Sequence, residues 1–272
     1  MLTSILQGGC ANQLFQYAFG YAQSRRLGVE LQLDISSFHG DSMRQYSLGL
    51  FKGVHETLVE NTKANIFEDG MPYNQSVVNM IKNGDCIRGY FQTSKYFDKH
   101  RSELIDIFQP KKPLTYNGST TRDMILDAGD SSCFLTIRRT DYVVKQEFHG
   151  VLPMNYYETA LAELIKEVPE LTLFVFSDEP EWCRQNLRLS VPYILAGTYD
   201  QSTPTHLGRE DEDLHLMSLC KHAIMANSSF SWWGAYLSRR PDEGRIIYGP
   251  QQWFTTKDLD SRDIMLSHWR KL

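Results

Sequence analysis

The sequence has no long apolar run and no excess of basic charge. No stretch of the 272 residues approaches the roughly 18 consecutive apolar residues that a membrane helix needs. The formal net charge of −5 provides no overall basic field that would attract nucleic acid or anionic lipid. We therefore expect no nucleic-acid partner and no membrane span, while peripheral association with a membrane stays open. Any anion that the protein binds must be held by a local site.

Cysteine is scarce, and its few copies do not form a recognisable framework. The five cysteines are odd in number, scattered along the chain, and never arranged as a C-x-x-C pair. This pattern argues against a disulfide scaffold and against a zinc site. It is typical of a reducing compartment, so we expect a cytoplasmic protein.

Familiar phosphate-binding loops are also missing. Gly8 and Gly9 follow a predicted strand at residues 2–6, but no G-x-G-x-x-G fingerprint and no Walker lysine accompany them. The glycine pair still allows the backbone to approach a ligand closely.

The acidic residues 211–213 could be interpreted as a metal-binding motif. Asp211, Glu212 and Asp213 spell D-x-D, a pattern that can hold a divalent ion. The run precedes a predicted helix, where acidic residues commonly occupy the first turn. We therefore interpret Asp211 and Glu212 as first-turn residues and expect no metal ion.

Two α/β segments are separated by a polar stretch. A strand at residues 2–6, a helix at 12–26 and a strand at 29–33 open the first segment. Residues 109–130 are polar and contain Pro and Gly, which predicts a linker that can end in a helix. Beyond it, strands are expected at 133–137, 172–176, 223–226 and 245–248, and helices at 154–167, 213–220 and 230–237. The predicted domains are therefore 1–129 and 130–272, each of a size that supports its own core.

The strongest cluster of functional side chains follows the predicted strand at 133–137. Ligands of parallel α/β sheets bind at the carboxyl ends of the strands, and Arg138, Arg139 and Asp141 stand at such an end. An arginine fork matches phosphate oxygens, and fixed positive groups stabilise a diphosphate that gains charge as it leaves. The alternative is that the arginines pair only with Asp141 or with solvent.

A second cluster, Asn-Ser-Ser-Phe at residues 227–230, lies between a predicted strand and a predicted helix. Asn and Ser are good N-caps, and the free N–H groups of a helix start can bind an anion. Capping without any ligand is the alternative. Trp232 and Trp233, which come next, are interpreted as core packing.

Taken in order, these motifs resemble the α1,2-fucosyltransferases of glycosyltransferase family 11. The matching stretches are GGCANQLFQYA (8–18), TIRRTDY (136–142), FSDEPEW (176–182) and DLHLMSLCKHAIMANSSFSWWGAYL (213–237). The resemblance implies a GT-B-like α/β fold, in which two Rossmann-type halves face each other across a cleft. It further implies inverting transfer of L-fucose from GDP-fucose to a glycan hydroxyl, α1,2 to galactose, without a metal ion or other cofactor. The N-terminal domain would then serve the acceptor and the C-terminal domain the GDP-sugar.

The resemblance also assigns roles to residues. Arg138 or Arg139 should contact the β-phosphate, Asp213 should accept hydrogen bonds from guanine, and Asn12 should face the fucose. The expected donor-binding residues are Gly9, Asn12, Asp178, Asp213, Asn227, Ser228, Ser229 and Phe230. The expected catalytic residues are Arg138, Arg139, Asp141 and Glu147.

The general base is open among Asp141, Glu147 and His149. An inverting transfer needs a group that takes the proton of the acceptor hydroxyl. Glu147 is favoured, because it lies near the position where related α1,6-fucosyltransferases carry a catalytic carboxylate.

Two departures from the family pattern keep other functions open. Thr136 stands where the arginine motif usually has His, and Cys10-Ala11 replaces Leu-Gly before Asn12. The alternatives are a transferase for another GDP-linked deoxysugar, and a catalytically inactive module that binds a glycan or a nucleotide.

Overall fold

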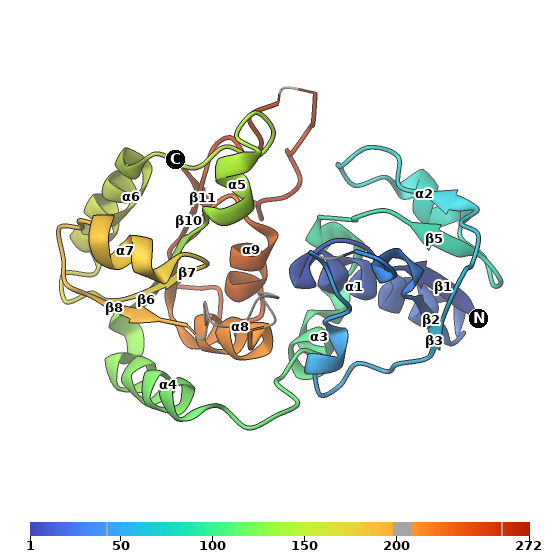
Figure 1. The fold of residues 1–272 in the computed structure, drawn as a ribbon, viewed down its shortest axis with the longest axis horizontal. Coiled ribbons are helices and arrows are strands. Elements are labelled where there is room, and N and C mark those ends of the chain that lie inside the picture. Colours follow the sequence, from blue (N-terminus) through green and yellow to red (C-terminus); the bar gives the residue numbers. More distant parts are fainter. Residues whose placement is uncertain (42, 198–207, 257) are drawn as a thin grey trace. The chain divides into compact units, whose positions relative to one another are not determined.

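The computed structural model describes residues 1–41, 43–197, 208–256 and 258–272 (Figure 1). The chain forms two compact units. Unit 1 comprises Met1–Lys111 and Leu259–Leu266, and unit 2 comprises Lys112–Asp258 and Ser267–Leu272. Each unit has its own sheet, in which all pairs of neighbouring strands run parallel. The prediction of two α/β halves is confirmed.

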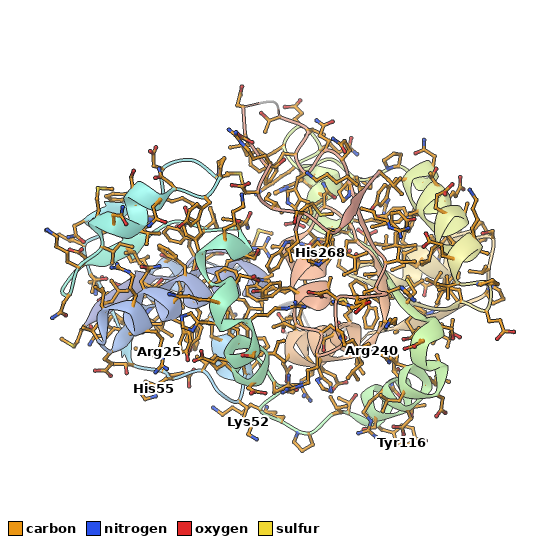
Figure 2. All side chains as sticks on the ribbon, turned by 180° about the vertical axis from the view of Figure 1, so that it is seen from behind. Arg25, Lys52, His55, Tyr116, Arg240 and His268 are labelled. Carbon is orange, nitrogen blue, oxygen red and sulfur yellow. The ribbon has the colours of Figure 1, made fainter. Side chains whose placement is uncertain are left out.

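The units divide at Lys111–Lys112, whereas the sequence predicted a boundary after residue 129. Most of the expected linker forms helix α4 (Tyr116–Ala128), which packs on helix α8 (Glu210–Leu219). Thr115 caps α4, and its N–H and hydroxyl donate to Glu212 at 2.8 and 2.6 Å. Tyr116, by contrast, is 87% exposed on the outer side of the helix (Figure 2). The polar stretch thus belongs to unit 2 because one buried carboxylate anchors it.

Unit 1 contains a five-stranded sheet in the order β3-β2-β1-β5-β4. Its strands are β1 (Leu2–Ile5), β2 (Leu31–Asp34), β3 (Leu58–Val59), β4 (Ile66–Phe67) and β5 (Cys86–Arg88). Its helices are α1 (Cys10–Leu27), α2 (Gln75–Met80) and α3 (Arg101–Ile107), with 3₁₀ turns at Ser36–Phe38, Leu48–Leu50, Ser94–Tyr96 and Asp98–His100. Helix α1 lies close against β1 and β2, since a Cβ on Gly20 would come within 2.8 Å of Leu31 and 3.3 Å of Ser4.

Unit 2 contains a six-stranded sheet in the order β11-β10-β9-β6-β7-β8. Its strands are β6 (Ser132–Ile137), β7 (Thr172–Ser177), β8 (Tyr193–Ala196), β9 (His222–Ile224), β10 (Ile247–Gly249) and β11 (Arg270–Lys271). Besides α4 and α8, its helices are α5 (Thr140–Val144), α6 (Met154–Glu167), α7 (Pro180–Asn186) and α9 (Ser229–Tyr236), with a 3₁₀ turn at Gly129–Ser131.

Both faces of the unit 2 sheet are covered by helices, as Figure 1 shows for α6 and α7 on one side and α8 and α9 on the other. All six residues of β6 are buried. Cys133, Leu135 and Ile137 pack among side chains of α6 and α7, while the Thr136 hydroxyl meets Ser231 of α9. A strand covered on both faces is mainly apolar, as β6 is, and its one hydroxyl within 133–137, that of Thr136, is hydrogen-bonded.

No helix within the described ranges is long and apolar enough to cross a membrane. The five cysteines are all free and buried.

Candidate active site

Four neighbouring strands bring the polar motifs of unit 2 to one edge of its sheet. Strands β9, β6, β7 and β8 lie side by side and run parallel, so their carboxyl ends meet at that edge. Arg138 follows β6 directly, Asp178 follows β7, and Asn227 comes shortly after β9. The residues singled out in the sequence therefore lie just after strands, at the edge where ligands of parallel α/β sheets bind.

Arg138 is held between two carboxylates. Its Nη2 donates to Asp141 at 2.5 Å, and its Nη1 pairs with Asp178 at 3.0 Å. Its guanidinium also lies 5.3 Å from the ring centre of Tyr142. Burial acts to lower the pKa of Arg138, but the two carboxylates outweigh burial and raise it. The buried Nε has no hydrogen-bond partner among the described residues, so one oriented donor of this guanidinium is unused.

Arg139 points to a different set of partners. Its Nε donates to Glu179 at 3.0 Å, and its guanidinium lies 3.9 Å from the ring centre of Trp182 on α7. Its backbone N–H donates to Asp178 at 3.0 Å. The two arginine side chains therefore diverge, and Arg139 braces the sheet edge against α7.

Asp178 connects both arginines and the start of α5. One oxygen accepts from the backbone of Arg139, and the other accepts from the Thr140 hydroxyl at 2.5 Å while pairing with Arg138. The cluster of Arg138, Arg139, Asp141, Asp178 and Glu179 contains two cations and three anions. The formal charge of this cluster is therefore not positive, so an anion bound here would depend on oriented donors.

The start of α9 lies at the same edge of the sheet and is capped by a serine. Ser228 is the N-cap, and its hydroxyl accepts from the N–H of Phe230 at 3.3 Å. Ser229 and Phe230 are partly exposed. Trp232 and Trp233 are fully buried and pack on Tyr236, which confirms their interpretation as core residues.

Thr136, the residue in place of the usual histidine, is 95% buried, with 5% of its surface exposed. Its hydroxyl accepts from the N–H of Ala226 at 2.8 Å and shares a 2.7 Å hydrogen bond with Ser231. The threonine thus links β6 to the turn between β9 and α9.

Asn227 is buried beneath the same turn. Its side-chain amide donates to the carbonyl oxygens of His149 (2.7 Å), Gly150 (3.1 Å) and Trp253 (3.2 Å). Its backbone oxygen accepts from the Tyr142 hydroxyl at 3.0 Å.

The acidic start of α8 separates into three different environments. Asp211 is buried and pairs twice with Arg209 at 3.0 Å, and Glu212 anchors α4. Asp213 is partly exposed beside β8, where a Cβ on Gly197 would lie 3.5 Å from each of its carboxylate oxygens. Across the described parts of the chain, no group of three His, Cys, Asp or Glu side chains is arranged to hold a metal ion.

The three candidates for the general base also differ. Asp141 is engaged by Arg138 and by the Thr140 hydroxyl. His149 stacks on Tyr142 with ring centres 4.3 Å apart. Glu147 is exposed in the turn that follows α5. Of the three, Glu147 presents its carboxylate most openly to solvent.

Comparison with known proteins identifies the family. Residues 85–271 match the model of glycosyl transferase family 11. The chain belongs to this family. It is 30% identical to the O-antigen biosynthesis glycosyltransferase WbnK of Escherichia coli, with 92% of this chain and 94% of the relative covered. It is also 30% identical to an alpha-1,2-colitosyltransferase of Escherichia coli, with 98% and 97% covered. A shorter match, 31% identical over 38% of this chain and 27% of the relative, is to galactoside alpha-(1,2)-fucosyltransferase 1 of Lagothrix lagotricha.

Unit 1 of this family 11 chain carries a separate polar group at its own sheet edge. Gly8 has a φ of +78°, and a Cβ there would lie 2.7 Å from the amide nitrogen of Asn12. The Asn12 side-chain oxygen accepts from Gln92 at 2.8 Å. Gly9 caps α1 without a side-chain bond. The predicted residues Gly9 and Asn12 thus lie together in unit 1, apart in sequence from the arginine motif.

Several partners in these two groups were not predicted as site residues. Gln92 follows β5, Thr140 opens α5, and Glu179 with Trp182 lies at the start of α7. Glu179 and Trp182 do fall within the motif FSDEPEW, so their sequence signal was present without an assigned role.

Proposed function

We propose that this family 11 enzyme transfers a deoxyhexosyl group, L-fucose in the first place, from a GDP-sugar to a hydroxyl of a glycan. The observation that carries the proposal is the geometry of Arg138. Two carboxylates fix its guanidinium at the carboxyl edge of the sheet, and one buried donor has no partner among the described residues. A rigid donor of this kind can stabilise the charge that develops on a leaving diphosphate.

The nucleoside would bind at the neighbouring strand ends. The two oxygens of Asp213 can accept the paired N–H groups on the edge of guanine, and Gly197 leaves room beside them. Ser228, Ser229 and Phe230, at the start of α9, would line the phosphates, as the resemblance implies. Gly9 stays a predicted donor-binding residue, and Asn12 stays the residue predicted to face the fucose.

We propose Glu147 as the general base in an inverting transfer. Its exposed carboxylate can meet a glycan hydroxyl, whereas Asp141 is committed to Arg138. The proton of the attacking hydroxyl would pass to Glu147 as the oxygen bonds to the anomeric carbon and the GDP leaves. No metal ion is required in this scheme, because Arg138 supplies the stabilising donors.

The donor could instead carry colitose, and one observation favours this second candidate. The similarity to the E. coli alpha-1,2-colitosyltransferase extends over almost the whole chain. The name of WbnK places that relative in O-antigen biosynthesis, so we propose an O-antigen oligosaccharide as the acceptor class. The free cysteines are those of a protein from a reducing compartment, so we propose a cytoplasmic location.

The test is a transfer assay with a β-galactoside and separate GDP-fucose, GDP-colitose and GDP-mannose donors. Product from GDP-fucose alone would support the first candidate, and product from GDP-colitose alone the second. Binding of GDP without product from any donor or acceptor would instead indicate an inactive module. Analysis of the linkage in the product would decide whether transfer is α1,2.

A further inference from the structure

We propose that Asn227 is a positioning residue, which fixes the turn that carries Glu147 and makes no side-chain contact with the donor. The inference rests on the proposed function, because it needs Glu147 to act in transfer. It departs from the expectation that Asn227 binds the donor through its side chain.

The side chain of Asn227 joins the turn after β9 to two other stretches of chain, residues 149–150 and residue 253. Its amide nitrogen donates to the carbonyl oxygens of His149, Gly150 and Trp253 at 2.7, 3.1 and 3.2 Å. An amide group has two hydrogens, so three bonds include at least one shared hydrogen. Asn227 is only 3% exposed. Its donors are therefore fully used inside the protein, and none is left for a ligand.

The turn held by Asn227 contains Glu147. Because the turn is short, a shift of its ends would also shift Glu147. Its start is fixed to α5, because the N–H groups of Phe148 and His149 donate to the carbonyl of Lys145. At its end Gly150 has a φ of +69°, a conformation that favours glycine. Asn227 binds just after Glu147, at the two residues where the turn ends.

A second anchor holds the middle of the turn. The hydroxyl of Thr255 donates to the carbonyl of Gln146 at 3.0 Å, and the N–H of Thr255 donates to that of Phe148 at 3.1 Å. These two carbonyls flank Glu147 in sequence. The segment 253–255 and Asn227 together fix the backbone on both sides of Glu147, while its side chain stays exposed.

Asn227 also connects this turn to the arginine. Its backbone oxygen accepts from the Tyr142 hydroxyl at 3.0 Å, and the Tyr142 ring lies 5.3 Å from the guanidinium carbon of Arg138. His149 stacks on the Tyr142 ring, with ring centres 4.3 Å apart. One buried asparagine thus sets the position of the proposed base relative to the group that faces the leaving diphosphate. Misplacement of a reacting group by about 1 Å can cost roughly 10²-fold in rate.

The experiment compares Asn227→Ala with a matched control, Tyr156→Phe. The Tyr156 hydroxyl donates to the carbonyl of Met225 at 2.7 Å, so the control removes a buried hydrogen bond two residues away without touching the turn. We expect both variants to lose stability. Only Asn227→Ala should lower kcat, by about 10- to 100-fold, with the Kd for GDP within about twofold of the parent. A comparable loss of kcat in Tyr156→Phe would mean that any weakening of this region impairs transfer, and would overturn the proposal.

A milder variant, Thr255→Val, tests the same proposal in case Asn227→Ala does not fold. Thr255→Val keeps the shape of the side chain and removes only the bond to Gln146. We expect it to fold like the parent and to lower kcat by a smaller factor, again without loss of GDP affinity. Unchanged kcat in a folded Thr255→Val together with unchanged kcat in Asn227→Ala would refute the role of these anchors.

The double variant Asn227→Ala with Glu147→Gln shows whether Asn227 acts on kcat through Glu147 or through general stabilisation. If Asn227 acts through Glu147, the double variant should be no slower than Glu147→Gln alone. Multiplication of the two losses would show that Asn227 acts elsewhere. A weaker Kd for GDP in Asn227→Ala would return it to the donor-binding residues. Absence of transfer by the parent enzyme would instead reject the proposed function, which the parent assay tests first.

Discussion

Arg138 and Asp178 are joined by a 3.0 Å ion pair between Nη1 and Oδ2, across the carboxyl ends of β6 and β7. The last residues of these strands, Ile137 and Ser177, are directly paired in the sheet. The ion pair is therefore set by the register of the sheet, and the guanidinium has little freedom left to lose when a ligand arrives. Such preorganisation is what electrostatic stabilisation of a transition state requires.

We predict that Arg138→Lys lowers kcat by about 10²–10³, the usual cost of one oriented donor to a developing negative charge. Lysine keeps the charge but cannot pair with Asp141 and Asp178 while directing another donor elsewhere. Steady-state kinetics with the donor identified in the transfer assay will measure the effect. Full activity of this variant would show that Arg138 is only part of a solvated charged edge.

We predict that Arg139→Lys lowers stability more than it lowers kcat. The substitution removes the stacking on Trp182 and weakens the bond to Glu179, at an expected cost of about 1–2 kcal/mol in unfolding free energy. We expect kcat to change much less than in Arg138→Lys. Thermal or urea unfolding and kinetics on the same preparations will test this. If Arg139→Lys is the inactive variant and keeps its stability, the roles of the two arginines are reversed.

We predict that Asp213→Ala removes the preference for guanine. Paired hydrogen bonds from guanine to a carboxylate contribute about 1.5–3 kcal/mol, so GDP affinity should fall by a factor of roughly 10 to 150. Titration calorimetry with GDP and ADP should then give similar affinities for the variant. An unchanged preference for GDP would reject the assignment of Asp213 to the base.

We predict that transfer proceeds without a divalent metal ion, because fixed donors around Arg138 can stabilise the leaving diphosphate. The assay is run with and without excess EDTA. Loss of activity that Mn²⁺ or Mg²⁺ restores would overturn this prediction and would make Asp211 and Asp213 candidate ligands.

The sequence was most informative where apolar runs are long and covered on both faces. The strands at residues 2–6, 133–137 and 172–176 and the helix at 154–167 are confirmed almost to their ends. Strands β3 and β4 have two residues each and exist through pairing with β2 and β5, so their own sequence carries no period. The linker prediction for residues 109–130 allowed a helix only at its end, whereas α4 takes up most of the stretch, because Glu212 secures its start.

The candidate site, like the fold, could be predicted only where its residues adjoin recognisable strands. The positions of Arg138 and Asp178 could be predicted, since both follow recognisable strands. Their pairing with one another depends on the order of strands in the sheet, which the sequence does not state. For Asn227, the three carbonyl partners come from residues 149, 150 and 253, and only the folded chain brings them together.

Thr136→Val should destabilise the protein by about 1–3 kcal/mol. The change keeps the shape of the side chain but leaves the buried N–H of Ala226 without its acceptor and the Ser231 hydroxyl without its partner. Thr136→Ser, which keeps the hydroxyl, is the matched control and should lose less. Urea unfolding of the three proteins measures the difference. Equal stability of the valine variant and the parent would show that another group satisfies Ala226.

The last prediction concerns pH and the buried histidine of β9. His222 accepts from the N–H of Ile246 through Nδ1 at 3.0 Å, so Nε2 carries the hydrogen that meets the carbonyl of Asp130 at 3.0 Å. The bond from Ile246 requires the neutral ring, because a protonated Nδ1 cannot accept a hydrogen bond. Burial is the main cause that lowers the pKa of His222 below its ordinary value of 6.5.

Because the pKa of His222 is lower in the folded than in the unfolded chain, acid should destabilise the protein. Below about pH 6.5 the unfolded chain takes up a proton at His222 that the folded chain resists, so the unfolded state is favoured as the pH falls. The stabilisation is complete above the unfolded pKa and is lost as the pH falls towards the folded pKa. We expect the unfolding free energy to decline between pH 7 and pH 5, with a smaller decline in His222→Gln. The variant should be less stable than the parent at pH 8, where the parent keeps both hydrogen bonds, and the gap should narrow at pH 5. A gap that stays constant from pH 8 to pH 5 would mean that His222 does not contribute to the pH dependence of folding.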